Sequence, residues 1–144
     1  MKIYSVSEKQ KKNSLINEAD FESDYLESIN NPKKFWKEKA EETLEWFSNW
    51  DEVISSNLEE GKVEWFKNGK LNACFNCVDR HLENYSNKTA IIWEGDSPED
   101  NKKISFEELH KNVCKFANLL KSRKIKKGDR VCIYMPMIPE AAYA

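Results

Sequence analysis

Apolar residues recur with a helical period in the last third of the chain. Ser105 precedes this pattern and Glu108 follows three residues later, which is the spacing of a helix-starting capping box. The next apolar residues are spaced three and four positions apart and predict one amphipathic helix: Leu109, Val113, Phe116, Ala117 and Leu120.

A nearly continuous apolar run follows that helix. Gly128 lies in a Lys-Gly-Asp turn signal, and residues 131–135 (VCIYM) come directly after it. Such a run is typical of a strand that is covered on both faces, as in parallel sheets. Pro136 ends the run, and Pro139 can open another helix. We therefore predict half of a βαβ-type unit here.

The N-terminal third predicts helices only. Residues 1 to about 19 are polar without a clear period, and we expect a mobile arm. A helix face follows, formed by Phe21, Tyr25, Leu26 and Ile29. Asn31 as N-cap and Pro32 at the first helical position then start a second helix, which we expect to run to about Phe47. Its predicted buried side consists of Phe35, Trp36, Ala40, Leu44 and Phe47.

The middle of the chain predicts short elements. Residues 63–66 (VEWF) are a short strand that ends at the Asn68-Gly69 tight turn. Asn72 can cap a helix that we expect to continue to Leu82. Residues 89–94 (TAIIWE) are a β-branched strand, and 95–101 a polar loop.

Composition excludes few classes of protein. The chain has 144 residues, of which 40% are hydrophobic and 33% charged, and its formal net charge is -2. That charge argues against a nucleic-acid protein that relies on bulk positive charge. No apolar run approaches the roughly 20 residues of a membrane span, and the N-terminus has no signal-peptide pattern. We expect a cytoplasmic protein.

The cysteines at 74, 77, 114 and 132 raise the question of zinc or disulfides. Cys74 and Cys77 have the C-x-x-C spacing, but no second close pair follows them. Structural zinc sites usually draw their ligands from two close pairs on loops. We expect reduced thiols that act as small buried hydrophobic groups.

Asp79, Arg80 and His81 together resemble a polar catalytic cluster. However, neighbouring helical residues point in different directions and cannot form a triad by themselves. We favour structural hydrogen bonds for Asp79 and Arg80, with His81 packed. Neither His81 nor His110 has a suitably spaced carboxylate, cysteine or second histidine.

Aromatic residues are dense before position 67. A stacking platform for a base or sugar is one interpretation, and docking anchors on a larger body are another. We favour the anchors, because no basic groove interleaves with these rings: Phe35, Trp36, Trp46, Phe47, Trp50, Trp65 and Phe66.

The glycines at 61, 69, 95 and 128 are isolated, so the chain has no glycine-rich phosphate loop. No Ser or Cys lies in a nucleophile-elbow pattern. We therefore expect no catalytic, cofactor-binding or metal-binding residue in this chain.

Several motifs resemble those of a known family. ISFEELHKNVCKFANLL and KKGDRVCIYMPMIPEAAYA resemble an early helix, strand and helix of adenylate-forming enzymes. YLESINNPKKFWKEKA, LEWFSNWDEV and VEWFKNGKLNACFNCVDRHL resemble the N-terminal segment of the acetyl-CoA synthetases, the AMP-forming acetate–CoA ligases. Asn68 stands where glycine is expected; because Asn also tolerates positive φ, the turn should survive. Cys77 fits the family pattern and Cys74 does not.

The resemblance implies an α/β fold: an N-terminal helical wrap and the first, incomplete elements of the large adenylation domain. It implies a mobile arm at 1–19, an acetyl-CoA synthetase-type segment at 20–86 and a truncated AMP-binding domain from 87 to 144. The family joins acetate to coenzyme A through an acetyl-adenylate, using ATP and Mg²⁺. The residues that bind these substrates are expected beyond Ala144, so the rest of the polypeptide is the expected partner.

Two alternatives remain open. In the first, the chain is a stand-alone binding or regulatory module of the same fold. In the second, it is the matching part of a ligase for propionate or a longer acid. An ending inside a helix favours a truncated, inactive enzyme over a module. We also expect poor solubility, because a strand at 131–135 would expose backbone donors and apolar faces.

Overall fold

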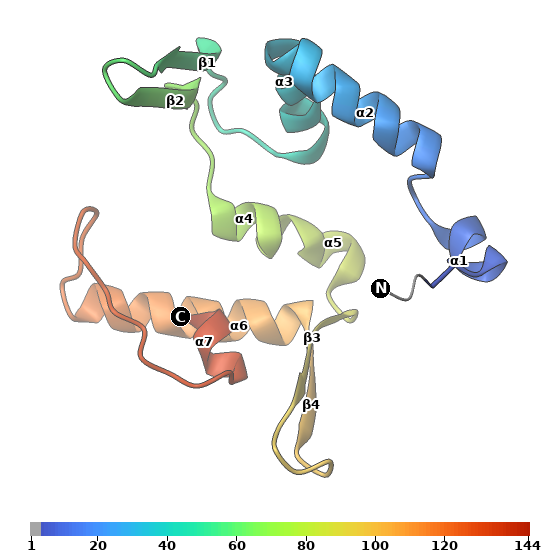
Figure 1. Ribbon diagram of the computed structural model, residues 1–144. Helices are drawn as coiled ribbons and strands as arrows, with labels where there is room; N and C mark the ends of the chain where they lie inside the picture. The colour runs from blue at the N-terminus through green and yellow to red at the C-terminus, as the bar shows by residue number, and fades with distance from the viewer. Residues whose placement is uncertain (1–3) are drawn as a thin grey trace. The chain divides into compact units, whose positions relative to one another are not determined.

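The computed structural model describes residues 4–144, which form mixed helices and small antiparallel sheets (Figure 1). Contacts divide the chain into two compact units, one ending at Leu71 and the other beginning at Asn72. Met1 to Ile3, the start of the predicted mobile arm, lie outside the described residues.

The first unit begins with a short helix that the sequence did not predict. Helix α1 spans Glu8–Asn13, and Ser7 and Gln10 form a reciprocal capping box at its start. The local cap supplies hydrogen bonds in a segment that lacks an apolar period. Helix α2 spans Glu18–Asn30 and has its own capping box between Asn17 and Asp20. The mobility of the arm stays a prediction.

Helix α3 spans Pro32–Thr43 and is shorter than predicted. Pro32 occupies the first turn as expected, but the predicted side-chain cap by Asn31 is absent, since its amide donates to Glu27 Oε2 at 3.0 Å. The helix ends early because the following segment pairs elsewhere: Phe47 N–H donates to Lys70 O at 2.8 Å. Phe47, predicted to be buried, is 61% exposed.

An antiparallel hairpin completes the first unit. Strand β2, Lys62–Lys67, contains the predicted strand, and its partner β1, Glu52–Asn57, was not predicted. Asn68 has a φ of 62°, so it takes the left-handed conformation expected at this turn. Trp46 Nε1–H donates to Ala40 O at 3.1 Å and thereby ties the segment before the hairpin to the end of α3.

The second unit opens with three short helical segments instead of one. Asn72 caps α4, Ala73–Cys77, by accepting the Phe75 N–H at 3.0 Å, as predicted. The helix then breaks at Val78, which has a ψ of -64° and a buried side chain. A 3-10 turn η1, Asp79–His81, and helix α5, Leu82–Tyr85, follow.

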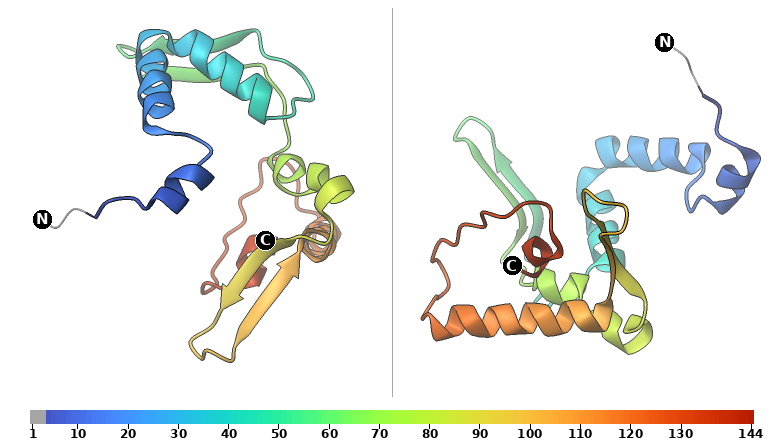
Figure 2. Two further views of the ribbon diagram at one scale, coloured as in Figure 1. Left: turned by 90° about the vertical axis from the view of Figure 1, so that its right-hand side faces the viewer. Right: turned by 90° about the horizontal axis from the view of Figure 1, so that it is seen from below.

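A second hairpin follows α5 and projects from the N-terminal end of α6 (Figure 2). Strand β3, Thr89–Glu94, is the predicted strand. Its antiparallel partner β4, Asn101–Ser105, was not predicted. Ser105 is also opposite Thr89, and it accepts the Glu108 N–H at 3.2 Å to cap the long helix α6, Phe106–Ser122.

The predicted strand at 131–135 does not form. The structure assigns no regular element between Arg123 and Ile138, and helix α7, Pro139–Tyr143, follows. A strand needs a neighbour for its backbone groups, and the described ladders are β1–β2 and β3–β4 only. Trp93 Nε1–H instead donates to Met137 O at 2.7 Å, which fastens the far end of this segment to β3.

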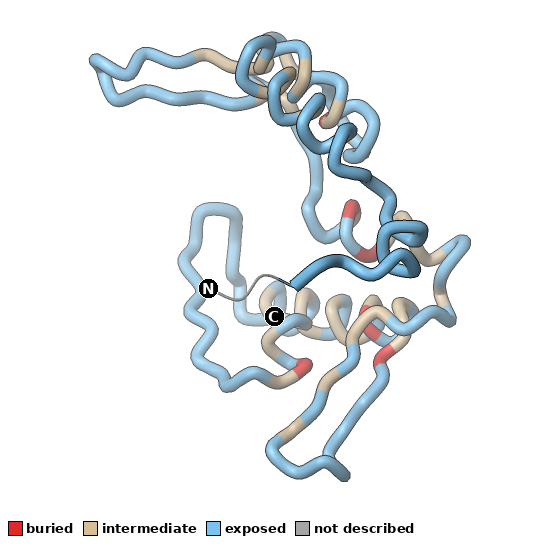
Figure 3. Tube along the Cα trace, turned by 45° about the vertical axis from the view of Figure 1, so that its right-hand side comes forward, coloured by how far each residue is buried: buried red, intermediate tan, exposed pale blue. Residues whose placement is uncertain are grey.

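Few described side chains are buried (Figure 3). The second unit has a small core of Val78, Ile104 and Leu109, with Ala90, Ile91, Val113 and Tyr143 packed around it. In the first unit Ala40 is buried. Most of the aromatic and aliphatic surface of residues 4–144 therefore faces solvent.

Candidate functional site

Four titratable side chains of the second unit meet between the start of η1 and the first half of α6. Asp79 Oδ1 lies 3.4 Å from His110 Nε2. The same ring nitrogen lies 3.4 Å from Cys114 Sγ. The other oxygen of Asp79, Oδ2, accepts the S–H of Cys74 at 3.7 Å. We call these four residues the Asp79–His110 cluster.

Local structure explains how these residues meet. His110 and Cys114 are one turn apart on α6, so they lie on the same face. Leu109, on the adjoining face of α6, lies in the core and packs with Val78. Asp79 directly follows Val78 and is therefore carried to α6 when that core forms.

The geometry differs from that of a hydrolytic triad. In a triad the acid holds one histidine nitrogen while the other takes a proton from the nucleophile. Here Asp79 and Cys114 both approach Nε2, so the imidazole cannot serve the two partners through separate nitrogens. This cluster can hold a proton between a carboxylate and a thiol, but it is not arranged for acyl transfer.

Burial raises the pKa of the Cys74 thiol, and the negative charge of Asp79, which accepts its S–H, raises the pKa further. Both effects disfavour the thiolate, which is the reactive form of cysteine. Cys74 is therefore held as a thiol in the resting structure.

The predicted Asp79, Arg80 and His81 run is divided among different partners. His81 packs its ring 5.5 Å from that of Phe106 and 6.2 Å from that of Tyr85, as the packing interpretation predicted. Asp79 turns instead to His110. The sequence analysis missed this contact, for which the spacing gives no signal. It also missed the contact between His110 and Cys114, for which their four-residue interval on a predicted helix was a usable signal.

The four cysteines are free thiols and, contrary to expectation, all are exposed. Exposure follows from the small core, which has no place for them. Over residues 4–144, no group of three or more His, Cys, Asp and Glu side chains is arranged to hold a metal ion.

The aromatic residues of the first unit pack against one another. Trp46 and Trp50 lie 4.7 Å apart at 68°, and Trp50 and Phe66 lie 5.0 Å apart at 66°. Trp36 and Trp65 meet edge to face at 6.0 Å. Such edge-to-face contacts are a preferred geometry of aromatic pairs and stabilise the packing of the first unit.

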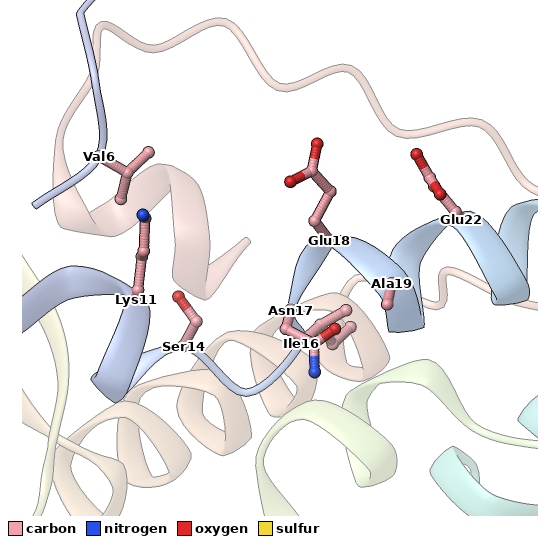
Figure 4. Close-up of a pocket in the computed structure, with 8 residues that line it drawn as sticks. All are labelled: Val6, Lys11, Ser14, Ile16, Asn17, Glu18, Ala19 and Glu22. Carbon is pink, nitrogen blue, oxygen red and sulfur yellow. The ribbon is translucent and has the colours of Figure 1, made fainter. Parts of the chain in front are cut away.

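A hollow of about 790 Å³ lies in the first unit beside the start of α2 (Figure 4). Its polar side chains include Lys11, Glu18 and Glu22. Glu18 and Glu22 extend side by side from the helix, while Lys11 points toward Val6 (Figure 4). These groups do not converge on a point where a substrate could be held.

No helix within residues 4–144 combines the length and apolar character that a membrane crossing requires.

Two family models match successive parts of the chain. Residues 21–77 match the acetyl-coenzyme A synthetase N-terminus, and residues 78–144 match the AMP-binding enzyme model. The two matches adjoin without a gap, so they cover every residue from Phe21 to Ala144.

Several proteins similar to this chain are named acetyl-coenzyme A synthetase. A Magnetococcus marinus acetyl-coenzyme A synthetase is 51% identical over 144 residues, which are 100% of this chain and 22% of that protein. One from Alcanivorax borkumensis is 53% identical over 142 residues, covering 99% of this chain and 22% of the relative. Acetyl-coenzyme A synthetase 2 of Pseudomonas aeruginosa is 48% identical over 142 residues, which are 99% of this chain and 22% of that protein.

The chain thus spans about a fifth of the length of the curated relatives it matches. Its second part corresponds to the N-terminal part of an AMP-binding domain. On these matches, residues 21–144 are similar to the N-terminal region of the acetyl-coenzyme A synthetases.

Proposed function

We propose that this chain is the N-terminal part of a longer acetate–CoA ligase, and that the longer protein is cytoplasmic. That enzyme would convert acetate, ATP and coenzyme A to acetyl-CoA, AMP and pyrophosphate through an acetyl-adenylate. The main support is the identity of about half of all residues to acetyl-coenzyme A synthetases over essentially the whole chain.

The chain's own role in this proposal is that of a scaffold. Tyr134 is 98% exposed and Met137 is 91% exposed, in a segment without regular structure. Burying such apolar surface is favourable, so these residues are suited to contact with a further part of the protein. The first 19 residues would be an arm, residues 20–86 the family-specific segment, and residues 87–144 the start of the adenylation domain.

The residues present do not fit ATP, Mg²⁺ or coenzyme A. Residues 4–144 contain no metal-holding group, and the isolated glycines provide no phosphate loop. We therefore propose that no catalytic or cofactor-binding residue lies in this chain.

A chimera tests the proposal directly. Residues 1–144 would replace the corresponding N-terminal residues of the Magnetococcus marinus acetyl-coenzyme A synthetase, and acetate-dependent pyrophosphate release would be measured. We expect an active chimera, whereas the 144-residue chain alone should release no pyrophosphate above background.

The controls separate the alternatives. A soluble, folded chimera that lacks activity would contradict the scaffold role and favour a stand-alone module. Turnover by the isolated chain would contradict the absence of catalytic residues. Comparison of acetate with propionate in the chimera reports on the remainder of the protein, because no residue of this chain is assigned to the acyl pocket.

A further inference from the structure

Two cysteines that are distant in sequence meet on one carboxylate–imidazole pair. Cys74 is in α4 and Cys114 is in the middle of α6. Cys74 Sγ contacts Asp79 Oδ2 at 3.7 Å, and Cys114 Sγ contacts His110 Nε2 at 3.4 Å. Because Asp79 and His110 contact each other, the two sulfurs belong to one continuous polar cluster.

Cys114 has the surroundings of a reactive thiol. It is exposed, and His110 Nε2 is placed to take its proton. The same ring nitrogen lies 3.4 Å from Asp79 Oδ1, so a carboxylate also contacts the nitrogen that receives the proton. The thiolate is the nucleophilic form of cysteine, so a base within reach of the sulfur is what attack on peroxide requires.

Cys74 has the opposite surroundings. Its S–H donates to a carboxylate, and burial is the main factor that opposes its ionisation. A thiol of this kind reacts slowly with an oxidant in solution. It can still attack an oxidised sulfur held in the same cluster, because Asp79 Oδ2, which accepts its S–H, is placed to take the proton and pass it to the leaving hydroxide.

We propose that Cys114 and Cys74 form a peroxide-reactive thiol pair, in which Cys114 is oxidised first and Cys74 resolves the product as a disulfide. The Cys114 thiolate attacks one oxygen of hydrogen peroxide, the O–O bond breaks, and the leaving hydroxide takes the proton from His110 to become water. Cys114 is then a sulfenic acid. The Cys74 sulfur attacks it, the S–O bond breaks, and the hydroxide leaves as water with the Cys74 proton. Two thiols lose two electrons, and one peroxide becomes two waters.

The disulfide would lock α4 to α6. An S–S bond requires the two Cα atoms to be about 4.4–6.8 Å apart, so the side chains of Asp79 and His110, through which the two sulfurs are now linked, must move aside. The hydrogen bond from Cys74 and the contact with His110 are then both lost. Oxidation therefore exchanges a polar contact between these helices for a covalent one.

Cys132 provides the matched comparison within the same chain. It is also an exposed, free thiol, but it lies in the irregular segment and, among residues 4–144, makes no hydrogen bond or ion pair with a histidine or carboxylate. Exposure alone would make Cys114 and Cys132 equally reactive, whereas the cluster makes Cys114 react faster.

The test is peroxide treatment of the reduced 144-residue chain at neutral pH, followed by alkylation and peptide mapping. We expect a Cys74–Cys114 disulfide as the first product. Cys74→Ser should stop the reaction at Cys114, where dimedone traps the sulfenic acid, and Cys114→Ser should abolish the disulfide. His110→Gln should slow oxidation of Cys114 by about tenfold or more, since general bases contribute at least that much.

Two variants act as controls. Cys132→Ser should leave the disulfide unchanged, and His81→Gln should leave the rate unchanged because His81 packs against Phe106. Equal oxidation rates of the four cysteines, equal rates in the native and urea-unfolded chain, or dimedone labelling of Cys132 ahead of Cys114 would each overturn the proposal.

Discussion

Gly69 lies against the indole ring of Trp46 with no space for a side chain between them. A Cβ at position 69 would stand 2.7 Å from Trp46 Cζ3 and 3.0 Å from Phe66 O. Trp46 is itself fixed by its hydrogen bond to Ala40 O. The close approach therefore joins the end of the first hairpin to the end of α3, and glycine is the residue that permits it.

Replacing Gly69 with alanine should destabilise the first unit by about 1–3 kcal/mol, the usual cost of overpacking. Urea unfolding followed by tryptophan fluorescence would measure this in a Trp93→Phe background, where the remaining tryptophans all lie before Leu71. Gly61→Ala is the control: its φ is 66° but nothing lies within 4 Å, so only about 1 kcal/mol of backbone strain is expected. A smaller loss for Gly69→Ala than for Gly61→Ala would contradict the steric argument.

Ile104→Ala should destabilise the second unit by about 2–5 kcal/mol, because the lost side chain leaves a cavity in its core. Ile104 is 2% exposed and packs with Val78 and Leu109. Ile92→Ala, on the adjacent strand and 67% exposed, should cost less than about 1 kcal/mol. Amide hydrogen exchange of residues 72–144 reports on this unit separately from the first. Equal losses for the two variants would show that the small core does not hold the unit together.

Lys111→Met should raise the pKa of Glu107. The hydrogen bond and charge of Lys111, with the hydrogen bond the larger cause, hold that pKa below the ordinary value of a glutamate. A depressed pKa means that the pair stabilises the folded state above the unfolded pKa, about 4.3. This stabilisation is lost as the pH falls through the lower, folded value.

Carboxyl-carbon NMR titration would give the Glu107 midpoint in each protein. Lys115→Met, which removes a cation elsewhere on α6, should leave that midpoint near its starting value. A midpoint that does not rise in Lys111→Met would contradict the assignment of the pair.

The isolated chain should self-associate as its concentration rises, since Tyr134 and Met137 present apolar side chains from a segment without regular structure. Replacing both residues with lysine should shift sedimentation velocity profiles toward monomer. Leu58→Lys is the control, because Leu58 is also exposed but lies in the turn of the first hairpin. Improved solubility from Leu58→Lys alone would point to general charge instead of this segment.

Local signals in the sequence predicted local structure well. Asn72 and Ser105 cap the helices that follow them, and Pro32 starts α3, because each of these effects depends on residues within one turn. The strand at 63–66 and the strand at 89–94 were also found from their composition.

Structure that depends on distant partners was missed. Helix α3 stops at Thr43 because the Lys70 carbonyl accepts the Phe47 N–H. No helix-breaking residue in the sequence indicates this end. The prediction of a strand at 131–135 was wrong because an apolar run cannot show whether a neighbouring strand exists. The approach of Asp79 to His110 depends on Val78 and Leu109 sharing a core, which no spacing in the sequence reveals.

The hydrogen bond from Trp93 to Met137 restricts the conformations of the irregular segment between α6 and α7. The segment is anchored by α6 at one end and by β3 near the other. An anchored span has already lost part of the loop entropy that strand formation would otherwise remove. Because both ends of the segment are already held, pairing with a neighbouring strand would cost less conformational entropy than pairing of a free segment.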